Sequence, residues 1–298
     1  MLQLTDEKKI WMEGKANEIR TSIIEMLIEA GSGHSAGPLG MADIFTALYF
    51  FVLKHDPTNP EWEERDRLVL SNGHICPVLY ATMAHAGYFP LEELKTLRKF
   101  GSRLQGHPHR EYMPFVENSS GPLGSGLSQT VGMCLADRID CGRYSPKQFY
   151  TLLSDGELEE GNTWEAVMLG AKEKLQNLTV IIDRNNIQIE GYTEDIMPLE
   201  PLRNKWEAFN WHTQTIDGHN FEAIVESIGQ AQAEFGKPSV IIANTIPGKG
   251  VSFMERRYEW HGNPPGKGPT DVVPKEKQGK EALRELRTLE GKIRSEHQ

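Results

Sequence analysis

Two polar positions, 30 residues apart, carry the clearest chemical signal in this sequence. Asp155-Gly156 follows an apolar run at residues 149–154 (FYTLLS), and Asn185 follows a second run at residues 178–183 (LTVIID). The residues between them predict a helix, so the segment forms a strand–helix–strand unit. Asp155 and Asn185 then lie at the carboxyl ends of neighbouring parallel strands. Open α/β sheets bind their ligands at that edge.

The ligands offered at this edge are hard oxygens. The Asp155 carboxylate, the Asn185 amide oxygen and one backbone carbonyl would supply half of the ligands of an octahedral site. This suits Mg²⁺, which would take its remaining ligands from phosphates and water. Gly156 has no Cβ, so a phosphate can approach its backbone closely. An isolated Asp-Gly is usually only a turn, but the intervening helix and the NxIxIxG pattern at 185–191 favour a site. No EF-hand, GxGxxG or GxxxxGK[ST] motif fits the chain.

Histidine follows glycine unusually often in this chain. The chain has 28 glycines and 10 histidines among 298 residues, and their random placement predicts fewer Gly-His pairs than the sequence contains. The pairs end at His34, His74, His107 and His219. His261 precedes Gly262 in the reverse order. Each histidine alone is more often structural, and none has zinc-motif spacing. Together they suggest imidazoles on tight loops, suited to proton transfer among sugar hydroxyls. His219 is interpreted as structural, beside a helix-capping Asn220.

The elements that must position these residues alternate between helix and strand. Apolar periodicity predicts helices at 7–30, 41–53, 80–86, 161–174 and 221–235, and strands at 67–71, 149–154, 178–183, 212–216 and 239–245. The alternation predicts an α/β fold with a mostly parallel sheet covered by helices on both faces.

We expect one domain over residues 1–298, with residues 272–298 as a charged C-terminal helical extension. Within that extension Leu286, Leu289 and Ile293 fall on one helical stripe. The simpler interpretation is an amphipathic helix packed on the body, and the alternative is a docking helix for a partner chain.

Composition excludes several classes of protein. With 32 Lys+Arg against 42 Asp+Glu the formal charge is −10, which argues against nucleic-acid binding. The three cysteines, Cys76, Cys134 and Cys141, show no CxxC spacing. The N-terminus lacks the apolar run of a secretory signal, and the longest apolar stretch, 44–53, is too short to cross a membrane. We therefore expect a cytoplasmic protein that binds neither membrane nor nucleic acid.

The segment from Asp155 to Asn185 resembles the thiamine diphosphate signature, a GDG start followed by Asn about thirty residues later, with Ser154 in place of the first Gly. Five further motifs are similar, in their order and spacing, to motifs in the N-terminal half of transketolases. They are SGHSAGPLG (32–40), LSNGH (70–74), QGHP (105–108), GPLGSGLS (121–128) and HGNPPG (261–266). The resemblance covers about residues 10–270 and implies the thiamine diphosphate-binding fold, with thiamine diphosphate and Mg²⁺ as cofactors; Ca²⁺ or Mn²⁺ could substitute.

The resemblance also implies roles for individual residues. Asp155, Asn185 and the carbonyl of Ile187 would hold the metal ion. The cofactor would be bound by His74, Gly121, Pro122, Leu123, Gly156, Asn185 and His261, with Gly121–Leu123 against its rings. The substrate channel would be lined by the catalytic candidates His34, His107 and His261. Acids such as Glu160 and Glu165 lie at the dimer interface of related enzymes, or are simply surface carboxylates at a helix start.

By the same resemblance, the activity is transfer of a two-carbon ketol unit from a ketose phosphate to an aldose phosphate. The glutamate that activates the cofactor lies, in the family, in a pyrimidine-binding domain for which we expect no room after residue 270. We therefore expect a diphosphate-binding subunit completed by a C-terminal transketolase subunit in an α₂β₂ assembly. The alternatives are the α subunit of a 2-oxo acid dehydrogenase E1 component, and a non-catalytic cofactor-binding module.

Overall fold

A five-stranded parallel sheet forms the centre of the molecule. The computed structural model describes residues 4–143 and 145–296. The strand order is β1-β2-β3-β7-β6, and every neighbouring pair is parallel. The strands are β1 (Arg67–Leu70), β2 (Phe149–Ser154), β3 (Leu178–Arg184), β7 (Ser239–Asn244) and β6 (His212–Asp217). All the carboxyl ends of the strands therefore lie along one edge.

Strands β2 and β3 are buried along their whole length because both faces of the sheet are covered. On β2, Tyr150 and Leu152 point into one hydrophobic core, whereas Phe149 and Leu153 point into the other. The sequence of a parallel strand that is packed on both sides is a continuous apolar run, and not an alternation of apolar and polar residues. The runs FYTLLS and LTVIID have that form.

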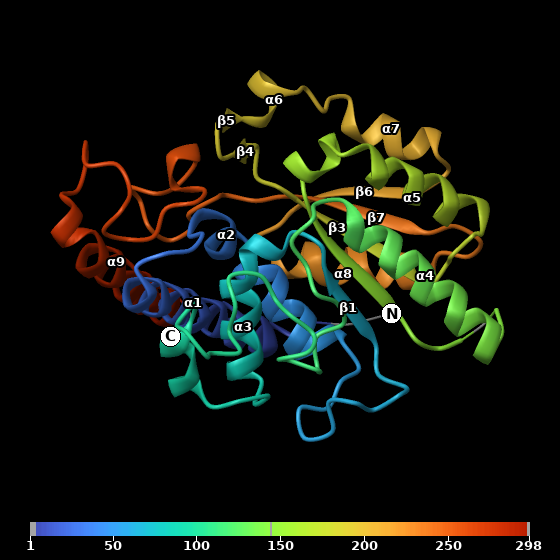
Figure 1. The fold of residues 1–298 in the computed structure, drawn as a ribbon, viewed down its shortest axis with the longest axis horizontal. Coiled ribbons are helices and arrows are strands. Elements are labelled where there is room, and N and C mark those ends of the chain that lie inside the picture. The colour runs from blue at the N-terminus through green and yellow to red at the C-terminus, as the bar shows by residue number, and fades with distance from the viewer. Residues whose placement is uncertain (1–3, 144, 297–298) are drawn as a thin grey trace.

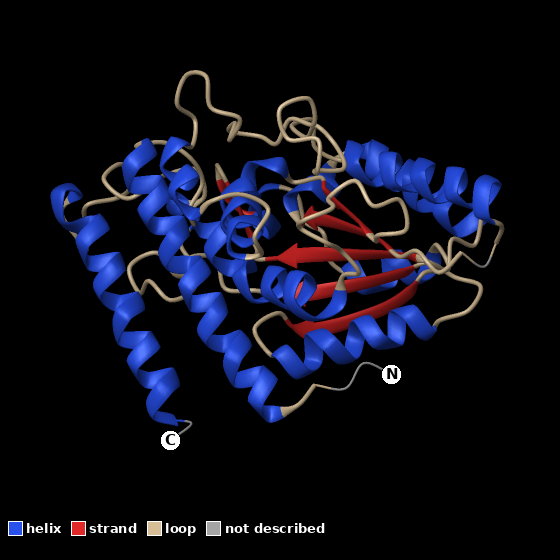
Figure 2. Cartoon of the chain, turned by 90° about the horizontal axis from the view of Figure 1, so that it is seen from below, coloured by secondary structure: helices blue, strands red, loops and turns tan. Residues whose placement is uncertain are grey.

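Helices cover both faces, as Figures 1 and 2 show. The first core lies between the sheet and α1 (Asp6–Ala30), α2 (Ala36–Ala47), α3 (Cys76–His85) and α8 (Phe221–Ala233). The second lies beneath α4 (Ser125–Cys141), α5 (Gly161–Lys172) and α7 (Leu202–Ala208). This arrangement confirms the predicted α/β fold class.

Several element boundaries differ from the prediction. Helix α2 begins at Ala36 rather than near residue 41, and continues as a π-helical turn, Leu48–Val52. Helix α3 begins at Cys76, with Pro77 in its first turn, where proline is tolerated. Both helices therefore begin before their predicted bounds.

Helix α4 was not predicted at all. Its buried residues Leu127, Val131 and Cys134 have helical spacing, but glycine and polar residues separate them and weaken the pattern. The short elements β4 (Ile187–Gln188), β5 (Gly191–Tyr192) and α6 (Thr193–Ile196) were also missed. They form a small antiparallel hairpin and one helical turn directly after the Asn185 position.

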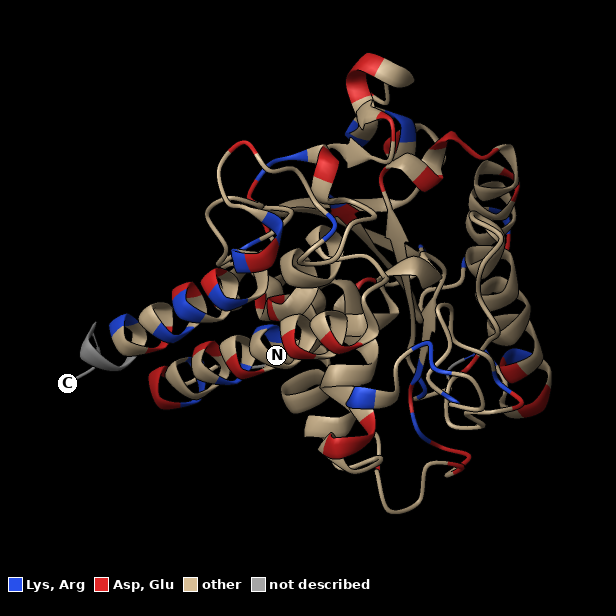
Figure 3. Ribbon diagram, turned by 60° about the vertical axis from the view of Figure 1, so that its left-hand side comes forward, with Lys and Arg blue, Asp and Glu red and all other residues tan. Residues whose placement is uncertain are grey.

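The predicted C-terminal helix is present as α9 (Lys275–Glu296), and it packs against the body of the protein. Ala282 and Leu286 are fully buried in the first core, and Nδ2 of Asn17 on α1 donates to the Leu286 carbonyl at 3.0 Å. Its outer surface carries charges of both signs, interspersed (Figure 3). Helix α9 therefore packs on the body through its apolar side. Within the described residues, every helix is too short or too polar to cross a membrane.

Replacing Leu286 by Ala should test how firmly α9 is docked. Loss of a fully buried leucine usually lowers the free energy of unfolding by about 2–5 kcal/mol. Urea unfolding followed by circular dichroism measures it, with the exposed Arg287→Ala as the matched control on the same helix. A Leu286→Ala protein as stable as the control would show that α9 contributes little to the core.

Candidate functional site

The carboxyl ends of three adjacent strands open into one pocket of about 460 Å³, a volume typical of small-molecule sites. The loop after β1 brings His74, the loop after β2 brings Gly156, and the loop after β3 brings Ile187. The complete lining is His34, His74, His107, Gly121, Leu123, Ser154, Gly156, Glu157, Ile187, Gln188, Ile189, Glu190 and His261. Segments far apart in the sequence therefore build a single site.

Three imidazole rings are packed against one another in this pocket. The ring centroids lie 4.9 Å apart for His34 and His74, 5.1 Å for His74 and His261, and 5.4 Å for His34 and His261. His107 lines the same pocket but is exposed. The four histidines predicted to act together thus meet in space.

Burial is the main influence on these imidazoles. It lowers the pKa of His34 to about 3, aided by the neighbouring His261, Arg98 and His107. It lowers the pKa of His261 to about 4 and that of His74 well below the usual value. At neutral pH these rings are uncharged, so each can donate at one nitrogen and accept at the other.

Asp155 lies between Ser154 and Gly156 of the pocket lining and is fully buried. Its Oδ2 accepts from the backbone N–H of Asn186 at 2.6 Å and from the Arg184 guanidinium at 3.1 Å, while its Oδ1 accepts from the Gly156 N–H at 2.8 Å. Burial raises the pKa of Asp155 to about 6, and Arg184 opposes that effect. The carboxylate is therefore rigidly held.

Asn185 is also buried and is oriented by its neighbours. Its Nδ2 donates to Oδ2 of Asp183 at 2.7 Å, and its Oδ1 accepts from the Ile187 N–H at 3.0 Å. Thr245 on the loop after β7 donates to the other Asp183 oxygen. Asp183 thus fixes the amide so that its oxygen, and not its nitrogen, faces the Ile187 backbone.

The donor set fits the cofactor that the sequence suggests. Asp155, Asn185 and the Ile187 carbonyl are hard oxygen donors at one edge, as a Mg²⁺–diphosphate group requires. Nδ1 of His261 and both amide atoms of Asn72, which lies two residues before His74, are buried without a hydrogen-bond partner in the described structure. Residues 4–143 and 145–296 contain no group of three or more His, Cys, Asp or Glu that could hold a metal by themselves. A metal here would therefore need amide, carbonyl and phosphate oxygens in addition to the Asp155 carboxylate.

Three predicted residues do not line the pocket. Pro122 is exposed beside Gly121 and Leu123, which do line it, whereas Asp155 and Asn185 are buried directly after β2 and β3. His219 is structural, as predicted: Ile246 N–H donates to its Nε2 at 2.7 Å, and its Nδ1 lies 2.7 Å from Oδ2 of Asp43. Asn220 caps α8 by accepting from the Ala223 N–H at 3.0 Å.

Sequence reasoning missed two charged residues of the site. Arg184 joins Asp155 to Glu194 and Glu200, and so ties the β3 end to the α6 segment. Glu157 is fully buried beside Asp155, and burial raises its pKa to about 7. In the sequence, Glu157 resembles a surface acid at a helix start because acids also follow at 159 and 160. The one local sign of burial is the apolar Leu158 directly after it.

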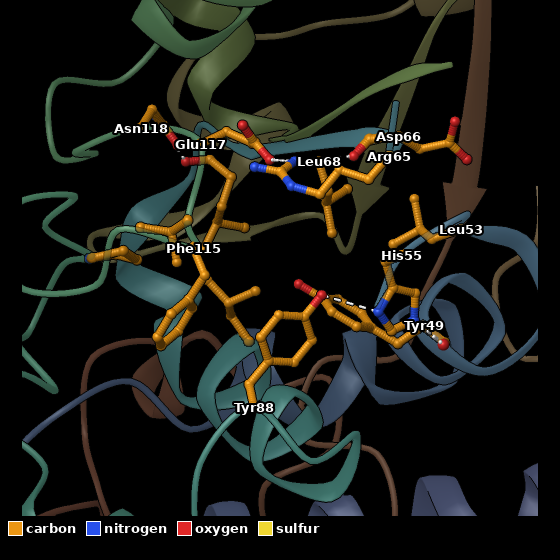
Figure 4. Close-up of a pocket in the computed structure, with 14 residues that line it drawn as sticks. Tyr49, Leu53, His55, Arg65, Asp66, Leu68, Tyr88, Phe115, Glu117 and Asn118 are labelled. Carbon is orange, nitrogen blue, oxygen red and sulfur yellow. Dashed lines mark hydrogen bonds and ion pairs between the residues drawn. The ribbon is translucent and has the colours of Figure 1, made fainter. Parts of the chain in front are cut away.

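A second cavity, about 30 Å³, lies elsewhere in the first core and has room only for water. Figure 4 shows His55 and Tyr88 turned toward each other on one side of it, with Nδ1 of His55 2.9 Å from the Tyr88 hydroxyl. Arg65 and Glu117 form a buried ion pair on another side. This cavity is a polar packing feature and not a second ligand site.

The model of the transketolase thiamine diphosphate-binding domain matches residues 12–284 of the chain. The chain belongs to this family. It is 46% identical over 255 residues to a 6-deoxy-6-sulfo-D-fructose transketolase subunit of Clostridium sp. (strain MSTE9), covering 86% of this chain and 92% of that protein. It is 38% identical to an apulose-4-phosphate transketolase subunit of Phocaeicola vulgatus over 96% of this chain and 97% of that protein.

Solved structures of this transketolase family share the fold. The transketolase of Leishmania mexicana superposes with a TM-score of 0.81 at 32% identity over 96% of this chain. The transketolase of Pichia stipitis in complex with sedoheptulose 7-phosphate gives 0.82 at 29% identity over 95%. The chain spans 45% and 44% of the lengths of those two proteins. The family match favours the transketolase interpretation over the 2-oxo acid dehydrogenase alternative.

The imidazoles of His34 and His261 should remain neutral at pH 5, where an exposed imidazole with a pKa of about 6.5 is protonated. Long-range ¹⁵N–¹H spectra, assigned with His34→Gln and His261→Gln, measure this directly. Since the unfolded chain then binds protons that the folded chain does not, the free energy of unfolding should fall as the pH drops from about 6.5 toward 4. Titration midpoints near 6.5 for these two rings would contradict the buried, neutral pocket.

Proposed function

We propose that this chain is the diphosphate-binding subunit of a two-chain, thiamine diphosphate-dependent transketolase. The reaction is transfer of a two-carbon ketol unit from a ketose phosphate to an aldose phosphate. The observation that carries the proposal is the pocket itself, which neutral imidazoles line together with Gly156 and Ile187 at the carboxyl edge of the sheet. Residues 1–298 would form one diphosphate-binding domain, with 272–298 as its helical extension.

The metal and diphosphate would be held from beneath the pocket. Asp155, Asn185 and the carbonyl of Ile187 would bind Mg²⁺, and Asn185 would also lie against the cofactor. Gly156 would leave space for a diphosphate oxygen, and His74 and His261 would donate to the diphosphate. The buried, partnerless Nδ1 of His261 supports that assignment.

The rest of the pocket would orient the rings and the sugar. Gly121, Pro122 and Leu123 would pack on the cofactor rings. The cofactor supplies, when bound, the nucleophilic carbon and the electron sink for carbon–carbon cleavage. His34, His107 and His261 would then bind the sugar hydroxyls and move protons at them. Neutral imidazoles suit this work because each can both donate and accept.

A second chain would complete the site. The C-terminal transketolase subunit would carry the pyrimidine-binding domain and its activating glutamate, giving an α₂β₂ assembly in the cytoplasm. Two similar proteins, which this chain covers almost completely, are themselves named as transketolase subunits, and this supports a divided enzyme. Their names also place 6-deoxy-6-sulfo-D-fructose and apulose 4-phosphate among the substrates to test, beside ordinary pentose phosphates.

The purified chain should show no ketol transfer alone with thiamine diphosphate and Mg²⁺, and should become active when mixed with a pyrimidine-binding partner encoded beside it. A coupled assay over the substrate panel measures the activity, and pyruvate decarboxylation is the control reaction for the dehydrogenase alternative. Turnover by the chain alone would overturn the divided enzyme. Absence of ketol transfer in a mixture that binds thiamine diphosphate would favour the non-catalytic module.

A further inference from the structure

One buried carboxylate joins three of the loops that build the pocket. Glu157 is fully buried, and Oε1 accepts from the Ser71 hydroxyl and from the Gly124 N–H at 2.6 Å. Its other oxygen, Oε2, accepts from the Ser154 N–H at 3.2 Å. These donors belong to the loop after β1, the start of α4 and the end of β2.

Each of these loops carries residues assigned above to the cofactor. Ser71 lies three residues before His74, Gly124 directly follows Gly121–Leu123, and Ser154 directly precedes Asp155. The three groups that donate hydrogen bonds to Glu157 are all neutral. The carboxyl group therefore links the three segments through hydrogen bonds and not through an ion pair. A charged acceptor makes stronger bonds to such donors than a neutral one does.

Close backbone packing shows that these contacts fix the loops tightly. Ser71 also accepts from the Gly126 N–H at 3.0 Å, and a Cβ on Gly126 would lie only 2.4 Å from the Ser71 Cβ. Gly124 has φ of +78°, a conformation that only glycine adopts without strain. The two glycines thus bring the start of α4 within reach of Glu157 and Ser71.

We propose that Glu157 is a positioning residue that sets the cofactor pocket by holding these three loops in register. Although Glu157 forms part of the pocket lining, it acts through the placement of His74, of Gly121–Leu123 and of the Asp155-Gly156 turn, and not on the reacting atoms. This inference rests on the proposed function, because it assumes that those segments hold thiamine diphosphate. It implies that tight binding of thiamine diphosphate requires Glu157 in addition to the metal ligands.

The Glu157→Gln variant tests the proposal in the assembled two-chain enzyme. Glutamine keeps the size of the side chain, but its amide N–H would face the Ser154 N–H or one of the donors at Oε1. Loss of one buried hydrogen bond in this way should raise the Kd for thiamine diphosphate about tenfold at saturating Mg²⁺. The kcat at saturating cofactor should stay near that of the unmodified enzyme. Calorimetric binding and steady-state kinetics measure the two quantities.

Two further variants complete the design. Ser71→Ala removes one donor to Glu157 without altering the carboxylate, and should raise the same Kd in the same direction, less than additively with Glu157→Gln. Glu226→Gln, on the exposed surface of α8, is the matched control and should leave Kd and kcat unchanged.

An unchanged Kd in a folded Glu157→Gln enzyme would overturn the proposal, and so would a fall in kcat without a change in Kd. If Glu157→Gln does not fold, the Ser71→Ala result decides: a raised Kd supports the proposal and an unchanged Kd overturns it. Failure of the proposed function is distinguishable, because then the unmodified assembly would itself bind no thiamine diphosphate.

Discussion

Burial of carboxylates at the carboxyl edge of the sheet is the constraint on which this site depends. Asp155, Glu157 and Asp183 are all almost completely buried there, and burial raises the pKa of each. An ionised carboxylate is costly to bury unless hydrogen bonds or cations compensate it. The surrounding backbone N–H groups, hydroxyls and the Arg184 guanidinium supply that compensation, and in doing so they fix the loops.

Burial shifts the pKa of the neighbouring imidazoles downward, and so disfavours the charged form there too. A histidine removed from water loses its proton rather than keeping it, so the pocket faces its ligand with neutral rings. The site therefore combines carboxyl and amide oxygens at the ends of β2 and β3 with neutral imidazole donors and acceptors in the pocket. The oxygens suit a metal–diphosphate group, and the imidazoles suit a polyhydroxylated sugar.

Much of this arrangement could be predicted from the sequence because its signals are local. The runs at 149–154 and 178–183 are long and apolar, and the polar residues directly after them fall at the sheet edge in any parallel topology. The Gly-His pairs identified the histidines, although only the fold shows that His34, His74 and His261 pack ring against ring.

The parts that could not be predicted depend on contacts between distant segments. Glu157 becomes a buried hub only because Ser71 and Gly124, from other parts of the chain, lie against it. Helix α4 was missed because its buried face is defined by the sheet and α5 more than by its own weak periodicity. Arg184 likewise is the last residue of a buried strand, with no local sign that it pairs with Asp155.

The proposed role of Asp155 as an anchor of metal-bound diphosphate is tested most directly by cofactor retention in the assembled enzyme. Thiamine diphosphate that remains bound after desalting is measured with Mg²⁺ and with EDTA, for the unmodified chain, for Asp155→Ala and for the exposed control Asp195→Ala. We predict Mg²⁺-dependent retention in the unmodified and control assemblies, and its loss in Asp155→Ala. Undiminished, Mg²⁺-dependent retention by Asp155→Ala would contradict the account.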